Sequence, residues 1–163
     1  MPNHKLSSKF AIIGGSQGFR LIKSDNFAEE IGPVETPFGE SVPVYRLAAE
    51  NKEIYYISRH GESGYHVSAP FVNYRANIWA LKEMGVERII AWSGPGAIDP
   101  AVPVGDILVP GDMIDETRGR SYTFYEDLGI GFIRQNPVFC PELAESLAGA
   151  IESRTGHCRR DDV

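Results

Sequence analysis

Cysteine is scarce in this chain: there are two, Cys140 and Cys158, and they do not form a C-x-x-C pair. So few thiols, without that spacing, suggest a reducing compartment. Long apolar runs are also absent, because no stretch approaches the ~20 residues that a transmembrane helix needs. Residues 1–10 are polar, carry Lys5 and Lys9, and lack the apolar core of a signal peptide. We therefore expect a soluble cytoplasmic protein without a membrane partner.

Basic residues are outnumbered by acidic ones. The chain has 16 Lys and Arg against 22 Asp and Glu, for a formal net charge of −6. This balance argues against nucleic acid as the main partner, so any anion site must be local and built from a few donors. The 163 residues, 42% of them hydrophobic, suit one domain that needs no disulfide or metal to stabilise it. We expect a single domain over residues 1–163, with no metal.

Short apolar runs separated by glycine and proline predict a chain that mixes strands and helices. Strands are expected at residues 10–13, 42–47, 54–58, 86–92 and 105–110. Helices are expected at residues 73–84 and 141–153, and a long loop at residues 118–136. The strands at 42–47 and 54–58 are expected to form a hairpin or to be neighbours in one sheet. The pattern favours an α/β fold with a mixed sheet flanked by helices.

The first predicted helix, residues 73–84, has the spacing of an amphipathic element. Its apolar residues recur every three or four positions, and Gly85 is placed to end the helix. We expect one buried stripe on this helix, formed by Tyr74, Ile78, Leu81 and Met84.

Three predicted strands end in loops of one kind. The loops are Gly14-Gly15-Ser16, which opens a glycine-rich turn to Gly18, then Ser58-Arg59-His60-Gly61, and Ser93-Gly94. Each offers backbone N–H groups and a side-chain donor, and Arg presents a planar fork that suits phosphate. If the three strands are parallel neighbours, their loops meet at one edge of the sheet, where open α/β folds bind ligands. The sequence therefore predicts a phosphate pocket.

Two families are suggested by the segment around His60. Arg59-His60-Gly61-Glu62-Ser63 resembles the histidine phosphatase and phosphoglycerate mutase superfamily, in which this His becomes phosphorylated. That motif normally follows the first strand of its domain and needs a second catalytic His on a later loop. The only His after His66 is His157, near the end of the chain. We keep the histidine phosphatase reading as an alternative.

A second resemblance covers about residues 10 to 158. The chain resembles the methylthioadenosine phosphorylase branch of the trimeric purine nucleoside phosphorylases, with the matching segments in the same order. These are Ile12-Ile13-Gly14-Gly15-Ser16, Thr36-Pro37-Phe38-Gly39, Arg59-His60-Gly61 with His66, Val72 to Leu81, Gly105-Asp106-Ile107 and Phe139-Cys140-Pro141. The resemblance implies a phosphorylase/hydrolase-like fold. It also implies a pentosyltransferase of purine salvage that splits a purine nucleoside or methylthionucleoside with inorganic phosphate as co-substrate and no other cofactor.

The roles that the resemblance implies can be assigned residue by residue. Phosphate would be bound by Ser16, Arg59, His60 and Ser93, and the nucleoside would be contacted by Gly94, His66 and Phe132. Phe132, in the long loop, is expected to reach the site of a neighbouring subunit in a homo-oligomer, a trimer or a multiple of it. The loops depart from the family pattern at two places: Gln17 precedes Gly18, and Trp92-Ser93-Gly94-Pro95 replaces a T-A-C-G-type segment.

The resemblance also implies that part of the family's site is absent. The family continues into a second half that holds the Asp acting on the purine, so no catalytic residue is assigned within these 163 residues. We expect a truncated fold that carries the phosphate half of an active site. A further alternative is therefore a non-catalytic, phosphorylase-like module that binds phosphate or nucleoside.

Overall fold

The computed structural model describes residues 9–24, 27–49, 52–62, 66–121, 123–130 and 133–160. They fall into two compact units. Unit 1 comprises residues 9–94 and 119–124, and unit 2 comprises residues 95–118 and 125–160. The expectation that residues 1–163 form a single domain stays a prediction.

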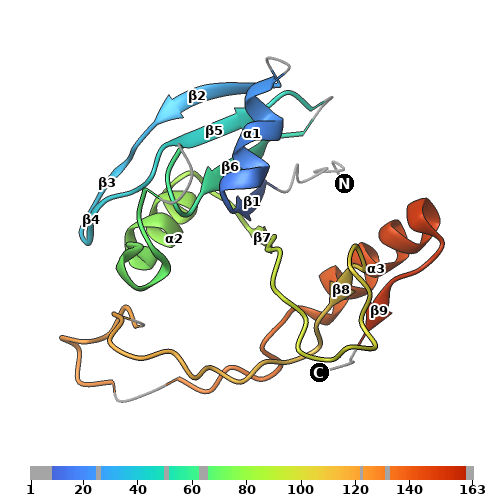
Figure 1. Ribbon diagram of the computed structural model, residues 1–163. Coiled ribbons are helices and arrows are strands. Elements are labelled where there is room, and N and C mark those ends of the chain that lie inside the picture. Colours follow the sequence, from blue (N-terminus) through green and yellow to red (C-terminus); the bar gives the residue numbers. More distant parts are fainter. Residues whose placement is uncertain are drawn as a thin grey trace, which may run out of the picture. The chain divides into compact units, whose positions relative to one another are not determined.

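A five-stranded mixed sheet forms the centre of unit 1 (Figure 1). Its order is β2 (Ala28–Gly32), β5 (Val44–Leu47), β6 (Ile54–Ser58), β1 (Phe10–Gly14) and β7 (Arg88–Ala91). The strands β6, β1 and β7 are parallel, whereas β2, β5 and β6 pair antiparallel. This arrangement confirms the mixed sheet and the predicted pairing of β5 with β6. A small antiparallel hairpin is formed by β3 (Glu35–Thr36) and β4 (Gly39–Glu40).

One helix covers each face of this sheet. Strand residues alternate between the faces, so that Tyr55 and Ile57 pack with Leu81 of α2 (Tyr74–Glu83), whereas Tyr56 packs with Phe19 of α1 (Ser16–Ser24). Ile22 of α1 and Met84, just after α2, extend these two clusters. The result is a helix–sheet–helix sandwich, with a short 3-10 helix, Ala69–Phe71, before α2.

The buried face of α2 differs from the predicted stripe. The buried residues are Ala76, Asn77, Ala80 and Leu81, so Leu81 is the one member of the predicted stripe that is buried. Tyr74, Ile78 and Met84 are half-buried. Ala76 and Ala80 are fully buried because small side chains let the helix backbone approach the sheet closely. Gly85, with φ of +77°, ends the helix as predicted.

Helix α1 and strand β2 were not predicted. The segment from Gly14 to Gly18 was expected to be a turn, but α1 begins at Ser16 and includes Gly18. Glycine is a poor helix former, so the local sequence favours a turn. Burial of Phe19 and Ile22 against the sheet outweighs that preference.

Unit 2 contains one long helix and a pair of two-residue strands. The helix α3 (Pro141–Thr155) ends at Gly156, which has φ of +79°, and it confirms the predicted helix. Strands β8 (Leu108–Val109) and β9 (Arg159–Arg160) pair parallel, and Ala148 of α3 packs on Val109 and Cys158. The expected strand at residues 105–110 is therefore limited to β8, and β9 was not predicted. Cys140 and Cys158 are both free thiols.

Candidate functional site

The three predicted loops lie at one edge of the sheet of unit 1. The carboxyl ends of the neighbouring parallel strands β6, β1 and β7 are level, with Gly14 opposite Ser58 and Ile13 opposite Ala91. Two backbone bonds continue the ladders into the loops: Arg59 N–H donates to Gly14 O (3.0 Å) and Trp92 N–H donates to Ile13 O (2.8 Å). The predicted convergence of the loops is thus confirmed.

Arg59 spans the ends of β6 and β7. Its Nη1 donates to the carbonyl of Trp92 (3.2 Å) and its Nη2 donates to the hydroxyl of Ser93 (3.3 Å). Both nitrogens also lie 3.7 Å from the point where a Cβ on Gly15 would stand, so the guanidinium covers the β1–α1 loop. These bonds use two of the five N–H donors of an arginine. The structure therefore brings Arg59, Ser93 and the glycine loop together around one fixed positive charge.

His60 is held in the tight turn that follows β6. Its side chain is 4% exposed, and Nδ1 lies 2.9 Å from the carbonyl of Val67. A carbonyl can only accept, so Nδ1 carries a proton and donates this bond. The turn itself is closed by the Ser58 hydroxyl, which donates to Gly61 O (2.7 Å), and Gly61 has φ of +87°. This bond and the turn fix the orientation of the imidazole ring.

The glycines of the first loop make room for Tyr56. A Cβ on Gly14 would lie 2.3 Å from the Tyr56 hydroxyl, and one on Gly18 would lie 2.7 Å from it. The hydroxyl donates to the carbonyl of Gly15 (3.1 Å). Because α1 begins at Ser16, the first N–H groups of the helix lie at this loop, and helix N-termini attract anions. Sequence reasoning identified the glycines but did not identify Tyr56.

The remaining predicted residues are placed as follows. His66 is exposed, and its Cβ lies 2.9 Å from the point where a Cβ on Gly61 would stand. Gly94 is exposed and directly follows Ser93. The backbone of Ser16 opens α1, but its side chain, like all of Phe132, lies outside the part of the chain that the structure describes. The ligand roles predicted for these residues, and for Arg59, His60 and Ser93, stay predictions.

Comparison with known proteins places the chain in a family. Residues 9–159, which include every predicted site residue, match the family described as the phosphorylase superfamily. The chain belongs to this superfamily. The histidine phosphatase and the non-catalytic readings are not favoured by the comparisons.

Two curated relatives within the phosphorylase superfamily illustrate the similarity. S-methyl-5'-thioadenosine phosphorylase of Pyrococcus furiosus is 42% identical over 137 residues, which are 83% of this chain and 51% of that protein. The probable 6-oxopurine nucleoside phosphorylase of Thermococcus kodakarensis is 38% identical over 149 residues, which are 87% of this chain and 54% of that protein. The chain spans about half the length of the curated relatives that it matches.

Solved structures of phosphorylases share the fold. A methylthioadenosine phosphorylase sourced from an Antarctic soil metagenomic library matches with a TM-score of 0.83 and 30% identity, over 95% of this chain and 54% of that one. The enzyme of the same name from Schistosoma mansoni, in its apo form, matches with a TM-score of 0.78 and 29% identity, over 91% of this chain and 54% of that one. The predicted α/β, phosphorylase-like fold is confirmed.

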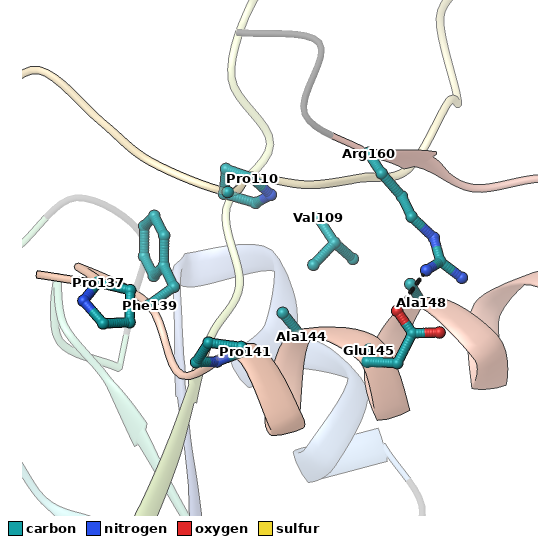
Figure 2. Close-up of a pocket in the computed structure, with 10 residues that line it drawn as sticks. Val109, Pro110, Pro137, Phe139, Pro141, Ala144, Glu145, Ala148 and Arg160 are labelled. Atoms are coloured by element: carbon teal, nitrogen blue, oxygen red, sulfur yellow. Dashed lines mark hydrogen bonds and ion pairs between the residues drawn. The ribbon is translucent and has the colours of Figure 1, made fainter.

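Unit 2 of this phosphorylase-superfamily chain has a separate pocket of about 220 Å³. Figure 2 shows it between α3 and the segment that follows β8, with Phe139 and the prolines on one side. Its lining is mostly apolar, and the two charged side chains, Glu145 and Arg160, are bound to each other at 2.6 Å. Arg160 also donates to Glu152 at 3.1 Å, so its positive charge is already matched by carboxylates. The strand-end loops of unit 1 are the stronger candidate site.

No helix among the described residues is long and apolar enough to cross a membrane.

Proposed function

We propose that this chain forms the phosphate-binding part of a purine nucleoside or 5'-methylthioadenosine phosphorylase. The observation that carries the proposal is the position of Arg59, which bridges β6 and β7 above Gly15 and next to Ser93. A guanidinium, a hydroxyl and a helix N-terminus at the ends of three parallel strands suit a phosphate dianion. The names of the relatives described above, phosphorylases of 6-oxopurine nucleosides or methylthioadenosine, support the same chemistry.

The reaction would be a transfer of the pentose to phosphate. A phosphate oxygen forms a bond to the anomeric carbon while the carbon–nitrogen bond to the purine breaks, and the bonding electrons leave with the purine. The purine takes up a proton, and the products are the free base and a pentose 1-phosphate. Arg59 supplies a permanent positive charge that holds the phosphate in position as the oxocarbenium-like transition state develops. His60, which the resemblance assigns to phosphate, lies in the adjoining turn.

The proposal extends to the setting of the enzyme. We propose a cytoplasmic enzyme of purine salvage that works as a homo-oligomer, a trimer or a multiple of it, with inorganic phosphate as its co-substrate and no other cofactor. The acid that protonates the purine would come from outside these 163 residues, since the relatives are about twice as long.

Phosphorolysis tests the proposal directly. Inosine and methylthioadenosine are each incubated with the chain, with and without phosphate, and release of the free base is measured. In parallel, phosphate binding is measured by calorimetry. We expect phosphate binding and little or no base release, because the acid that protonates the purine would come from outside these residues, and any release should require phosphate. A folded chain that neither binds phosphate nor releases base would contradict the proposal, and base release without phosphate would indicate hydrolysis.

A matched pair of variants locates the anion site. Arg59→Met should weaken phosphate binding by about 10- to 100-fold, the range expected for losing a charge-assisted hydrogen bond. Arg46→Met removes the same group from β5 of the same sheet, where Arg46 pairs with Glu29 at 2.7 Å, and it should leave phosphate binding unchanged. Equal effects of the two substitutions would refute the site. Trapping of a phosphohistidine at His60 would instead favour the histidine phosphatase reading.

A further inference from the structure

Tyr56 is bound to the loop that joins β1 to α1, although it lies on β6. Its hydroxyl donates to the carbonyl of Gly15 at 3.1 Å. The ring is 3% exposed and packs in the cluster that contains Phe19 and Tyr45. A ring enclosed in this way has little freedom to move, so its hydroxyl is a fixed point against which the loop is held.

We propose that Tyr56 is a positioning residue for the phosphate site, and that its hydroxyl sets the direction of the first helical N–H groups through the Gly15 carbonyl. This inference rests on the proposed function, because it assigns Tyr56 a role in that same site.

The planarity of the peptide bond connects the hydroxyl to the site. The carbonyl of Gly15 and the N–H of Ser16 belong to one trans peptide unit, in which they point in opposite directions. A hydroxyl that fixes the direction of the carbonyl therefore also fixes the opposite direction of the Ser16 N–H. Phe19 N–H also donates to the Gly15 carbonyl, at 3.4 Å, and this bond closes the first turn of α1. Tyr56 thus supports the end of the helix that would face an anion.

The glycines of the loop are adapted to this tyrosine. On Gly14, a Cβ would meet both the hydroxyl (2.3 Å) and two ring carbons (2.8 Å). On Gly18, a Cβ would meet the hydroxyl at 2.7 Å, and the next nearest atom is 3.5 Å away. The loop and Tyr56 form one packed unit.

The Tyr56 hydroxyl is protonated at neutral pH. Burial raises the pKa of Tyr56 to about 12, although the positive charge of Arg59 lowers it. At neutral pH the group is therefore a hydrogen-bond donor, as the contact with a carbonyl requires.

Tyr56→Phe, which removes only the hydroxyl, tests the proposal. Two properties are measured: the affinity for inorganic phosphate by calorimetry, and the exchange rate of the Phe19 amide by NMR. We expect phosphate binding to weaken and Phe19 exchange to accelerate, each by about two- to tenfold, as for the loss of one hydrogen bond. Tyr45→Phe is the control, since it removes a buried hydroxyl from the same cluster without touching the loop. It should leave the phosphate affinity unchanged and should not accelerate Phe19 exchange.

Each outcome has a defined meaning. Unchanged affinity and unchanged exchange in Tyr56→Phe would overturn the inference, and faster exchange with unchanged affinity would overturn its link to the anion site. If the unsubstituted chain does not bind phosphate, the proposed function fails, whereas the exchange rate still decides whether Tyr56 holds the loop. Gly18→Ala is a second variant that keeps the tyrosine and displaces its hydroxyl, and it should weaken phosphate binding in the same direction if Tyr56→Phe does not fold.

Discussion

Tyr45 and Tyr56 are opposite each other in register on β5 and β6 and pack in the same cluster, yet their hydroxyls differ in environment. The Tyr56 hydroxyl donates to Gly15, whereas the Tyr45 hydroxyl is buried without a partner among the described residues. Two residues with the same side chain and nearly the same burial thus have different roles. One supports the loop at the candidate site, and the other only fills the core. Removing the Tyr45 hydroxyl is therefore a matched control for removing the Tyr56 hydroxyl.

Removing the unpaired hydroxyl should stabilise the chain. Tyr45 is 0% exposed, and a buried donor without a partner costs free energy. Tyr45→Phe keeps the ring that packs edge-on against Phe19 and lies 5.0 Å from the Lys23 ammonium. We expect the free energy of unfolding to rise by about 1 kcal/mol. Urea denaturation measures it, and a loss of stability would show that the hydroxyl has a partner.

Tyr56 should make stability depend on alkaline pH. Burial raises its pKa from 10.0 to about 12, so the folded chain binds this proton more tightly than the unfolded chain does. Its contribution is complete below about pH 10 and is lost as the pH rises toward about 12, with a slope of at most about 1.4 kcal/mol per pH unit. Urea midpoints across this range, compared between the unsubstituted chain and Tyr56→Phe, isolate the contribution. Parallel pH profiles would contradict it.

Alanine at the two loop glycines should respond differently to removal of the hydroxyl. Gly18→Ala meets only the Tyr56 hydroxyl, so it should cost about 1–3 kcal/mol alone and become neutral or stabilising in a Tyr56→Phe background, where the better helix propensity of alanine remains. Gly14→Ala also meets ring carbons and should stay destabilising in both backgrounds. Denaturation of the four variants gives the comparison. The prediction would be wrong if Tyr56→Phe restored the stability of both glycine variants, or of neither.

Asn77 should be a stability residue. It is 3% exposed, and its Oδ1 accepts a hydrogen bond from the backbone N–H of Val42 at 3.0 Å. Asn77→Leu leaves the part-buried N–H of Val42 without its partner and should lower the free energy of unfolding by about 1–3 kcal/mol. Lys82→Ala, at an exposed position of the same helix, should change it by less than about 0.5 kcal/mol. Similar values for the two substitutions would mean that the Asn77 bond contributes little.

The strands of the site were predictable because their own residues favour the strand conformation. Ile54–Ser58 was expected as a strand with the bounds that the structure gives, and the run at Phe10 was expected nearly so. Each is a run of apolar, largely β-branched or aromatic residues that ends in glycine or a polar turn. The shared character of the loops after these strands was enough to predict their meeting point, because parallel neighbours end at the same edge of a sheet.

The parts that escaped prediction depend on distant contacts. Helix α1 forms from a glycine-rich segment only because Phe19 and Ile22 are buried against strands that come later in the chain. Strand β2 carries exposed glutamates at the edge of the sheet, so its sequence has no apolar alternation. In the sequence, Tyr56 is indistinguishable from the other apolar residues of its strand. Its hydrogen bond to Gly15 joins residues 41 positions apart, so the sequence pattern does not predict it. Packing between distant segments decided each of these features.

The topology of the sheet sets an order for the assembly of the site. Strand β1 comes first in the chain but is flanked by β6 and β7, with Phe10 paired to both Ile54 and Arg88. During synthesis, the backbone N–H and C=O groups on both edges of β1 therefore stay unpaired until β6 and then β7 have been made. Pairings between such distant segments form slowly and expose the nascent chain to aggregation. Arg59 can bond to Ser93 only after β7 has paired with β1. A ligand that requires both groups would therefore bind only chains in which this sheet is complete.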